Sequence, residues 1–129
     1  MTQVRLQLRL VLPGARTFGP GKAELLDLIA RHGSIAAAGR AMKMSYKRAW
    51  SLVEEMNAAF KAPLVTAERG GAERGGAQVT PLGQKVLAHY RALLEGLETQ
   101  GRQSLDFISL SLGDPVSPLP DAANSDMSD

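Results

Sequence analysis

The sequence predicts a mainly α-helical fold with a small β component. Apolar residues recur at helical spacing in three segments between residues 20 and 100, and short alternating or glycine-rich segments precede or separate them. The chain has 129 residues, 44% of them hydrophobic, which suits one domain with a buried core. We predict that this domain spans residues 1–112. Residues 113–129, which are rich in Pro, Asp and Ser, are expected to form a disordered acidic tail.

The first predicted element is a strand. Residues 3–11 alternate between apolar and polar side chains, as in a half-buried strand. Its apolar face holds Val4, Leu6, Leu8 and Leu10. Residues 12–21 contain enough Pro and Gly to predict a loop. Pro20 suits the first turn of a helix, which we expect to end at Gly33.

Three hydroxyl side chains mark the starts of further helices, because an N-cap oxygen accepts a hydrogen bond from a free backbone N–H. Ser34 precedes a short alanine-rich helix, and Ser45 precedes a helix over residues 46–60. Thr80, followed by proline, precedes a helix that runs to about residue 100. The core stripe of the 46–60 helix consists of Ala49, Val53, Met56 and Phe60.

A β-hairpin is predicted between the last two helices. Residues 64–68 and 77–80 have strand composition, and the glycine-rich segment 69–76 joins them. Residues 105–112 fit a continued helix at some positions and a strand at others, so the sequence leaves both open.

The net charge of +2 is unevenly distributed. Residues 1–102 hold all 15 Lys and Arg and 8 of the 13 acidic residues, a net charge of +7. Residues 103–129 hold the other 5 acidic residues, all Asp, and no Lys or Arg. A basic body with an acidic tail favours a polyanionic partner, and nucleic acid is the first candidate. A solvated basic surface without a partner is the alternative.

Composition argues against several classes of function. The absence of cysteine excludes disulfides, thiol nucleophiles and cysteine-ligated zinc, and two histidines are too few for a histidine-rich metal site. The paired glutamates at 54–55 and at 95 and 98 are expected on solvated helix faces. No apolar run reaches the roughly 18 residues of a membrane helix. The first ten residues alternate polar and apolar side chains and lack the continuous apolar stretch of a signal peptide. We therefore expect a cytoplasmic protein that is not an enzyme, with no catalytic residue, metal site or membrane partner.

The order of elements predicts a winged helix-turn-helix with an N-terminal strand and a long C-terminal dimerisation helix. In this architecture the second helix of the motif presents its N-terminal residues to base edges in the major groove. An ordinary helical hairpin in another small domain is the alternative. The candidate DNA-contacting residues are Ser34, Lys43, Ser45, Tyr46, Lys47, Arg48, Ser51, Arg69 and Arg74.

Different contacts are expected from these side chains. Lys47 and Arg48 suit guanine O6 and N7, Ser51 suits a base or a phosphate, and Tyr46 and Ser45 suit phosphates. Arg69 and Arg74, on the glycine-rich hairpin, suit phosphates or the minor groove. Solvated cations and a plain loose turn are the alternatives. Trp50, which flanks the core stripe, is expected to support the helix from a partly buried position.

The long helix has more apolar surface than one small domain requires. Two adjacent stripes run along it, and we expect the excess to pack against a second subunit, with the dimer helix spanning about residues 80–112. The candidate dimerisation residues are Leu82, Val86, Leu87, Tyr90, Leu93, Leu94 and Leu97.

The amino-acid sequence of these segments resembles that of a known family. The tract SIAAAGRAMKMSYKRAWSLVEEMN, followed by LV, a glycine-rich hairpin and VTPLGQKVL, resembles the N-terminal DNA-binding domain of ModE-type molybdate-responsive regulators. The most specific part lies between Ser45 and Asn57. The wider pattern is shared with LysR-class winged regulators, and the opening strand favours ModE. The resemblance covers about residues 3–100.

The resemblance implies a dimeric transcriptional regulator. It places the recognition helix over Ser45–Phe60, the wing over Leu64–Thr80, and the dimer helix from Pro81 to about Gln100. A role for molybdate is implied only by the family resemblance, because full-length members of the family carry molybdate-binding domains after the dimer helix. We expect no such domain in this chain and predict no cofactor.

The sequence therefore predicts a sequence-specific, DNA-binding transcriptional regulator that acts as a homodimer on double-stranded DNA. A DNA-silent dimerisation module that modulates a full-length regulator is the alternative. The cations on the recognition helix and the hairpin favour direct DNA binding.

Overall fold

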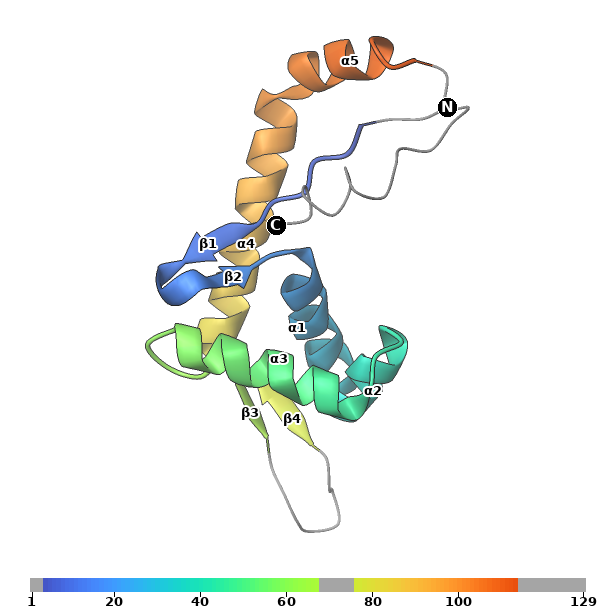
Figure 1. The fold of residues 1–129 in the computed structure, drawn as a ribbon. Helices are drawn as coiled ribbons and strands as arrows, with labels where there is room; N and C mark the ends of the chain where they lie inside the picture. The colour runs from blue at the N-terminus through green and yellow to red at the C-terminus, as the bar shows by residue number, and fades with distance from the viewer. Residues whose placement is uncertain (1–3, 68–75, 114–129) are drawn as a thin grey trace. The chain divides into compact units, whose positions relative to one another are not determined.

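The structure is a computed structural model that describes residues 4–67 and 76–113 (Figure 1). The chain divides into two compact units, one formed by Leu6–Gln100 and the other by the two ends of the chain. We describe the larger unit first. Most of the predicted tail, residues 114–129, lies outside the described residues.

An antiparallel hairpin opens the larger unit. Strand β1 (Leu10–Leu12) pairs with strand β2 (Arg16–Phe18), and a 3₁₀ turn over Pro13–Ala15 joins them. The predicted alternation is seen in the burial, because Leu6, Leu8 and Leu10 are half-buried between exposed polar residues. The prediction was wrong about the extent of the strand and about the loop. Regular pairing begins only at Leu10, and its partner β2 lies inside the Pro- and Gly-rich segment that predicted a loop.

Three helices follow, at the predicted starts. Helix α1 (Pro20–His32) begins at a proline and ends at Gly33, whose left-handed φ of 68° closes the last turn. Helix α2 (Ile35–Ala41) is capped by Ser34, whose Oγ accepts a hydrogen bond from Ala37 N at 3.0 Å. Helix α3 (Tyr46–Ala59) is capped by Ser45.

The second hairpin and the long helix also confirm the predicted order. Strands β3 (Val65–Ala67) and β4 (Ala77–Val79) pair antiparallel, with Val65 opposite Val79. A backbone bridge from Ser34 to Gly76 attaches this hairpin to the start of α2. Helix α4 (Pro81–Gln100) begins where Gly83 N donates to Thr80 Oγ1 at 3.0 Å.

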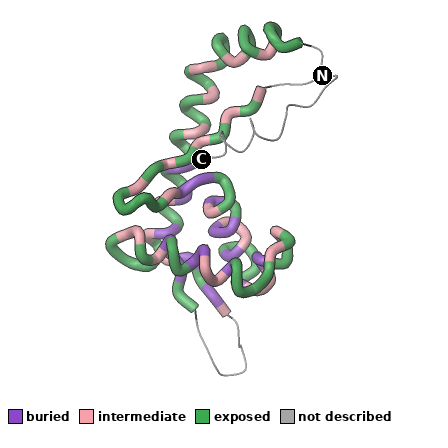
Figure 2. Tube along the Cα trace, in the orientation of Figure 1, coloured by how far each residue is buried: buried purple, intermediate pink, exposed green. Residues whose placement is uncertain are grey.

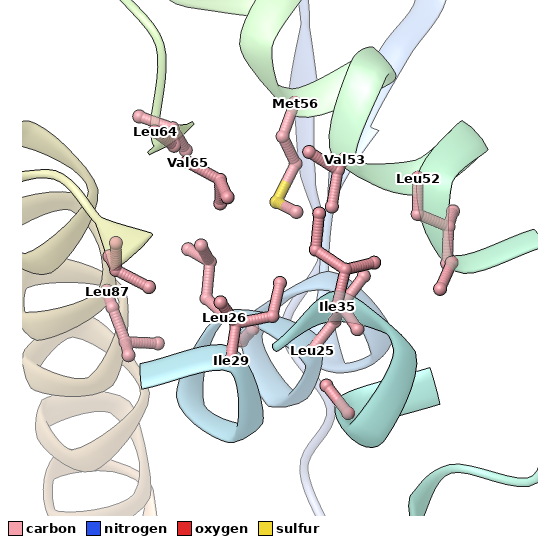
Figure 3. Close-up of a cluster of buried hydrophobic side chains, with 14 of the residues drawn as sticks. Leu25, Leu26, Ile29, Ile35, Leu52, Val53, Met56, Leu64, Val65 and Leu87 are labelled. Atoms are coloured by element: carbon pink, nitrogen blue, oxygen red, sulfur yellow. The ribbon is translucent and has the colours of Figure 1, made fainter. Parts of the chain in front are cut away.

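The core lies between α1 and α3 and is closed by the start of the second hairpin and by α4 (Figures 2 and 3). In the close-up, Leu26 and Ile29 of α1 point toward the side chains that α3 and the hairpin contribute. The largest fully buried side chains are Phe18, Leu25, Leu26, Ile29, Val53, Met56 and Leu64. Three of the four predicted stripe residues of α3 are buried, while Phe60 is half-buried and packs edge-on against Phe18.

The smaller unit contains helix α5 (Arg102–Leu110), which decides the ambiguous segment 105–112 in favour of a helix. Val4 N donates to Ser109 Oγ at 3.1 Å within this unit. Several large apolar side chains of α5 are exposed, with Phe107 at 71% and Leu110 at 86%. Within the described ranges, none of the helices combines the length and apolar character required to cross a membrane.

Candidate nucleic-acid interface

The turn between α2 and α3 is tightly packed. A Cβ added at Gly39 would lie 3.1 Å from the Cβ of Ala49, so the absence of a side chain lets the two helices approach. Met44 N donates to Gly39 O at 3.0 Å, and Met44 packs against the core. Lys43 adopts a positive φ of 60°, which is uncommon for a residue other than glycine. This packing fixes the angle at which α3 leaves the turn.

The first turn of α3 exposes charged and polar side chains. Ser45 Oγ accepts a hydrogen bond from Arg48 N at 3.0 Å, which satisfies one free donor at the helix start. Tyr46, Lys47 and Arg48 are exposed, and Ser51 is half-buried. By helical geometry, Lys47 and Ser51 lie opposite the buried stripe, while Arg48 and Tyr46 lie on its two flanks.

The cations near this turn form no ion pair with a carboxylate in the part of the chain that the structure describes. The ion pairs there involve Glu55 and Asp27, and neither carboxylate binds Lys43, Lys47 or Arg48. Glu55, farther along α3 on the same flank as Arg48, binds Lys22 of α1 at 2.9 Å. Three neighbouring positive charges without a carboxylate partner form a surface that suits an anionic ligand.

An aromatic pair lies on the other flank of α3. The rings of Tyr46 and Trp50 are 6.2 Å apart and nearly perpendicular, at 80°. Trp50 is half-buried and packs against the core, as expected for a supporting residue, while Tyr46 is 54% exposed.

Two residues that the sequence analysis did not single out hold the base of the second hairpin. Asn57 Oδ1 accepts hydrogen bonds from Leu64 N at 2.8 Å and Val65 N at 3.1 Å, and Asn57 Nδ2 donates to Val65 O at 3.0 Å. On the other side, a Cβ added at Gly83 would meet the Leu64 carbonyl oxygen and lie 2.8 Å from Val79 Cγ1. The start of the hairpin is thus fixed between α3 and α4.

The sequence contains weak signals for both residues. Asn57 interrupts an amphipathic helix on the flank that holds Trp50, where an apolar residue would otherwise be expected. A glycine inside the first turn of a helix is costly and often marks a close approach of another backbone.

The remaining predicted DNA-contacting residues are placed as follows. Ser34 is half-buried, caps α2 and bridges to Gly76, so it lies where the helix-turn-helix meets the second hairpin. Lys43 is exposed in the turn. Arg69 and Arg74 lie outside the described residues.

The structure divides the predicted dimerisation residues. Leu87 and Tyr90 are 7% and 4% exposed and belong to the core of their own domain, which leaves them little surface for a second subunit. Leu82 and Val86 are half-buried and pack against the same core. Leu94 is half-buried. Leu93 and Leu97 are 50% and 46% exposed. An apolar stripe alone does not distinguish packing within one chain from packing against a partner.

Tyr90 shows how firmly the first half of α4 is fixed. Its hydroxyl donates to Leu8 O at 2.6 Å, and its ring packs edge-on against Phe18 with the centroids 5.2 Å apart. Burial raises the pKa of the Tyr90 hydroxyl above its ordinary value of 10.0, because the charged phenolate is disfavoured away from water. Asp27 adds ion pairs to Arg31 at 2.9 Å and to Arg91 of α4 at 3.1 Å.

The described residues show no constellation suited to metal chemistry. Among them, no three His, Cys, Asp or Glu side chains gather closely enough to hold a metal ion. Asp27 is occupied by two arginines. The interface at the start of α3 is therefore the arrangement with the clearest chemical character.

The fold and this surface define the class: a winged helix-turn-helix domain whose helix α3 has a basic first turn. Residues 21–84 match the model of the family described as "Bacterial regulatory helix-turn-helix protein, lysR family". The match lies in the helix-turn-helix region and covers just under half of the 129 residues of this chain.

The curated relatives include proteins named ModE and proteins named for binding molybdenum-pterin. The chain is 45% identical over 93 residues to "Molybdenum-pterin-binding protein MopA" of Rhodobacter capsulatus, which covers 72% of this chain and 35% of MopA. It is 38% identical over 93 residues to "Molybdenum transport protein ModE" of Azotobacter vinelandii, covering 72% and 33%. It is 34% identical over 93 residues to "DNA-binding transcriptional dual regulator ModE" of Escherichia coli K12, covering 72% and 36%. The chain thus carries a ModE-type helix-turn-helix domain and spans about a third of the length of these relatives.

Proposed function

We propose that this chain binds double-stranded DNA with sequence specificity and regulates transcription as a ModE-like homodimer. The observation that carries the proposal is the first turn of α3, where Lys47 and Arg48 are exposed without a carboxylate partner in the described part of the chain. The packed turn at Gly39 fixes that helix end against α2. An N-terminal helix end of this kind enters the major groove in helix-turn-helix proteins.

Each side chain near the turn has a contact that suits its chemistry. Arg48 and Lys47 donate to guanine O6 and N7 or to phosphates, and Ser51 donates or accepts at a base edge. Lys43 and Ser45 lie at the start of the helix and suit phosphates, since the Ser45 hydroxyl keeps its hydrogen while its oxygen caps α3. Ser34, Arg69 and Arg74 complete the proposed contacts at the wing.

Homodimerisation is proposed through the second half of α4. Leu93 and Leu97 are one helical turn apart and about half exposed, which leaves an apolar stripe for a second copy. Two copies joined there would present two recognition helices to successive major grooves, about 34 Å apart along the duplex. The only link to molybdenum is that the names of the relatives mention it. We assign no molybdate contact to any residue of this chain.

Selection of bound duplexes from a randomised pool tests the proposal. We expect enrichment of one site with two inverted halves, equally with and without added molybdate. Size-exclusion chromatography with light scattering should show a dimer that Leu93→Asp and Leu97→Asp convert to a monomer. A chain that dimerises yet enriches no duplex would contradict DNA binding and would support a dimerisation module that modulates another regulator.

Salt dependence tests whether the cations bind phosphate. Binding of the selected duplex should weaken steeply with salt. Lys47→Ala or Lys43→Ala should reduce the slope of log K against log salt by about 1 for every phosphate that the variant no longer neutralises. Lys61→Ala is the matched control, because Lys61 is an exposed lysine beyond the opposite end of α3. A wild-type affinity that is independent of salt would refute the electrostatic basis of the interface.

A further inference from the structure

Tyr46, the more exposed member of the aromatic pair on α3, has no evident purpose in the fold. Tyr46 is the first residue of α3, and more than half of its surface is exposed. Its side chain forms no hydrogen bond with any residue in the described ranges, and its ring packs edge-on against that of Trp50. A large exposed aromatic side chain at the helix end that we propose enters DNA is therefore a candidate for direct contact with the DNA.

Trp50 makes the position of the Tyr46 ring well defined. The two residues are four positions apart and therefore lie one above the other on the same side of the helix. Trp50 is itself held against the core, so its ring forms a fixed support for the more exposed ring. Farther along this flank, Asn57 is bonded to strand β3, which anchors the same side of α3 to the second hairpin. A supported aromatic ring loses little conformational entropy on binding.

The three exposed residues of the first turn differ in what they can recognise. Arg48 and Lys47 are hydrogen-bond donors with positive charge, so they suit the acceptors of guanine or phosphate. Tyr46 offers an uncharged ring, and the apolar feature of the major groove is the 5-methyl group of thymine. A competing contact, from the Tyr46 hydroxyl to a phosphate, depends on the hydroxyl group and not on the ring.

We infer that Tyr46, supported by Trp50, is a specificity-determining residue that packs its ring against a thymine 5-methyl group in the major groove. The inference rests on the proposed function and adds one base class to it. The flank of α3 that carries Arg48 reads guanine or phosphate, whereas the flank that carries Tyr46 reads thymine.

The experiment removes the methyl group and the ring separately. In the duplex selected from the randomised pool, each thymine is replaced in turn by deoxyuridine, which lacks only the 5-methyl group. Affinities are measured for the wild-type chain, Tyr46→Ala and Tyr46→Phe, from the fluorescence of Trp50, the one tryptophan in the chain. Anisotropy of a labelled duplex gives the same affinities independently of Trp50. Tyr46→Phe is the matched control, since it keeps the ring and removes the hydroxyl.

We expect one thymine in each half-site at which deoxyuridine weakens wild-type binding about fourfold, the effect of burying one apolar carbon group fewer. Tyr46→Phe should behave like the wild type on both duplexes. Tyr46→Ala should bind the thymine duplex at least fourfold more weakly, with no further loss on the deoxyuridine duplex. That non-additivity is the signature of a direct ring–methyl contact.

Two results would overturn the inference while leaving DNA binding intact. In one, Tyr46→Phe binds as weakly as Tyr46→Ala, which would make the hydroxyl and a phosphate the contact. In the other, no thymine is sensitive to deoxyuridine, or the two losses add in full. Failure to enrich any duplex would instead refute the proposed function and this inference with it.

Discussion

At its C-terminal end, helix α3 is bound to its own chain, whereas at its N-terminal end it exposes charged and aromatic side chains. Asn57 uses both its carbonyl oxygen and its amide on the backbone of β3, and Lys22 binds Glu55. At the other end, Lys47 and Arg48 have no carboxylate partner among the described residues. The C-terminal end of α3 thus holds the fold together, while its N-terminal end is available to a ligand.

The two ends of α3 differ in whether their polar side chains bind the rest of the domain, so they separate residues that stabilise the fold from residues that are available to a ligand. A polar side chain whose hydrogen bonds are all made inside the domain stabilises the fold, and its loss leaves buried groups unpaired. An exposed cation without a partner contributes little to stability. Substitutions at the two ends should therefore change different measurements.

The largest effect is expected at the packed end. Gly83→Ala would push a methyl group into the Leu64 carbonyl oxygen and Val79, so we expect it to lower the free energy of unfolding by about 3 kcal/mol. Gly96→Ala is the matched control in the same helix, since nothing lies within 4 Å of the added carbon. It should stabilise the domain by about 1 kcal/mol. Urea unfolding gives both values, and equal effects of the two substitutions would contradict the packing at Gly83.

Asn57→Ala should follow in magnitude. It leaves two backbone N–H groups and one carbonyl oxygen without their partner, so we expect a loss of about 2 kcal/mol in the free energy of unfolding. Glu54→Ala, an exposed substitution on the same helix, should change stability by less than about 0.5 kcal/mol. If Asn57→Ala proved as stable as the wild type, its bonds to β3 would not hold the hairpin.

Arg48→Ala should leave stability unchanged and weaken DNA binding, the opposite of what is expected for substitutions at the packed end. Its unfolding midpoint in urea should match that of the wild type, because the side chain is exposed and makes no ion pair with a described residue. Binding to the selected duplex should fall about tenfold or more, and binding to random duplex much less, since a base contact carries specificity. Equal losses on both duplexes would make Arg48 a phosphate contact.

The smallest effect on stability is expected at the chain's two tyrosines, one buried and bonded inside the domain and the other exposed. Tyr90 is buried and bonded to Leu8 O, so Tyr90→Phe should cost about 1 kcal/mol of stability at neutral pH. Because burial raises the pKa of Tyr90 above 10.0, its stabilisation is complete below pH 10.0 and is lost as the pH rises through the raised pKa.

Urea unfolding at about pH 8 and about pH 11 tests this expectation. The stability of Tyr90→Phe should fall less between the two pH values than that of the wild type. Tyr46→Phe should follow the wild type, since the Tyr46 hydroxyl forms no hydrogen bond with a described residue. A wild-type loss no larger than that of Tyr90→Phe would contradict the role of Tyr90.

Much of the fold could be predicted because its signals are local. Pro20, Ser34, Ser45 and Thr80 act on the few residues that follow them, and the helices begin where these residues predicted. The exposed cations of α3 could also be placed, since they lie outside the apolar stripe of an amphipathic helix. Strand β2 could not be predicted, because three residues inside a Pro- and Gly-rich segment become a strand only by pairing with β1.

By itself, the sequence determined the order of elements from α1 to α4, the starts of these helices, the buried face of α3 and the basic character of its first turn. Only the tertiary structure decided which apolar residues of α4 belong to the domain's own core, since Tyr90 and Leu93 carry the same kind of signal at neighbouring positions. It also decided that Asn57 and Gly83 hold the second hairpin between two helices. The physical reason is that caps and periodicity act within one segment, whereas burial and side-chain hydrogen bonds depend on segments that meet only in the folded chain.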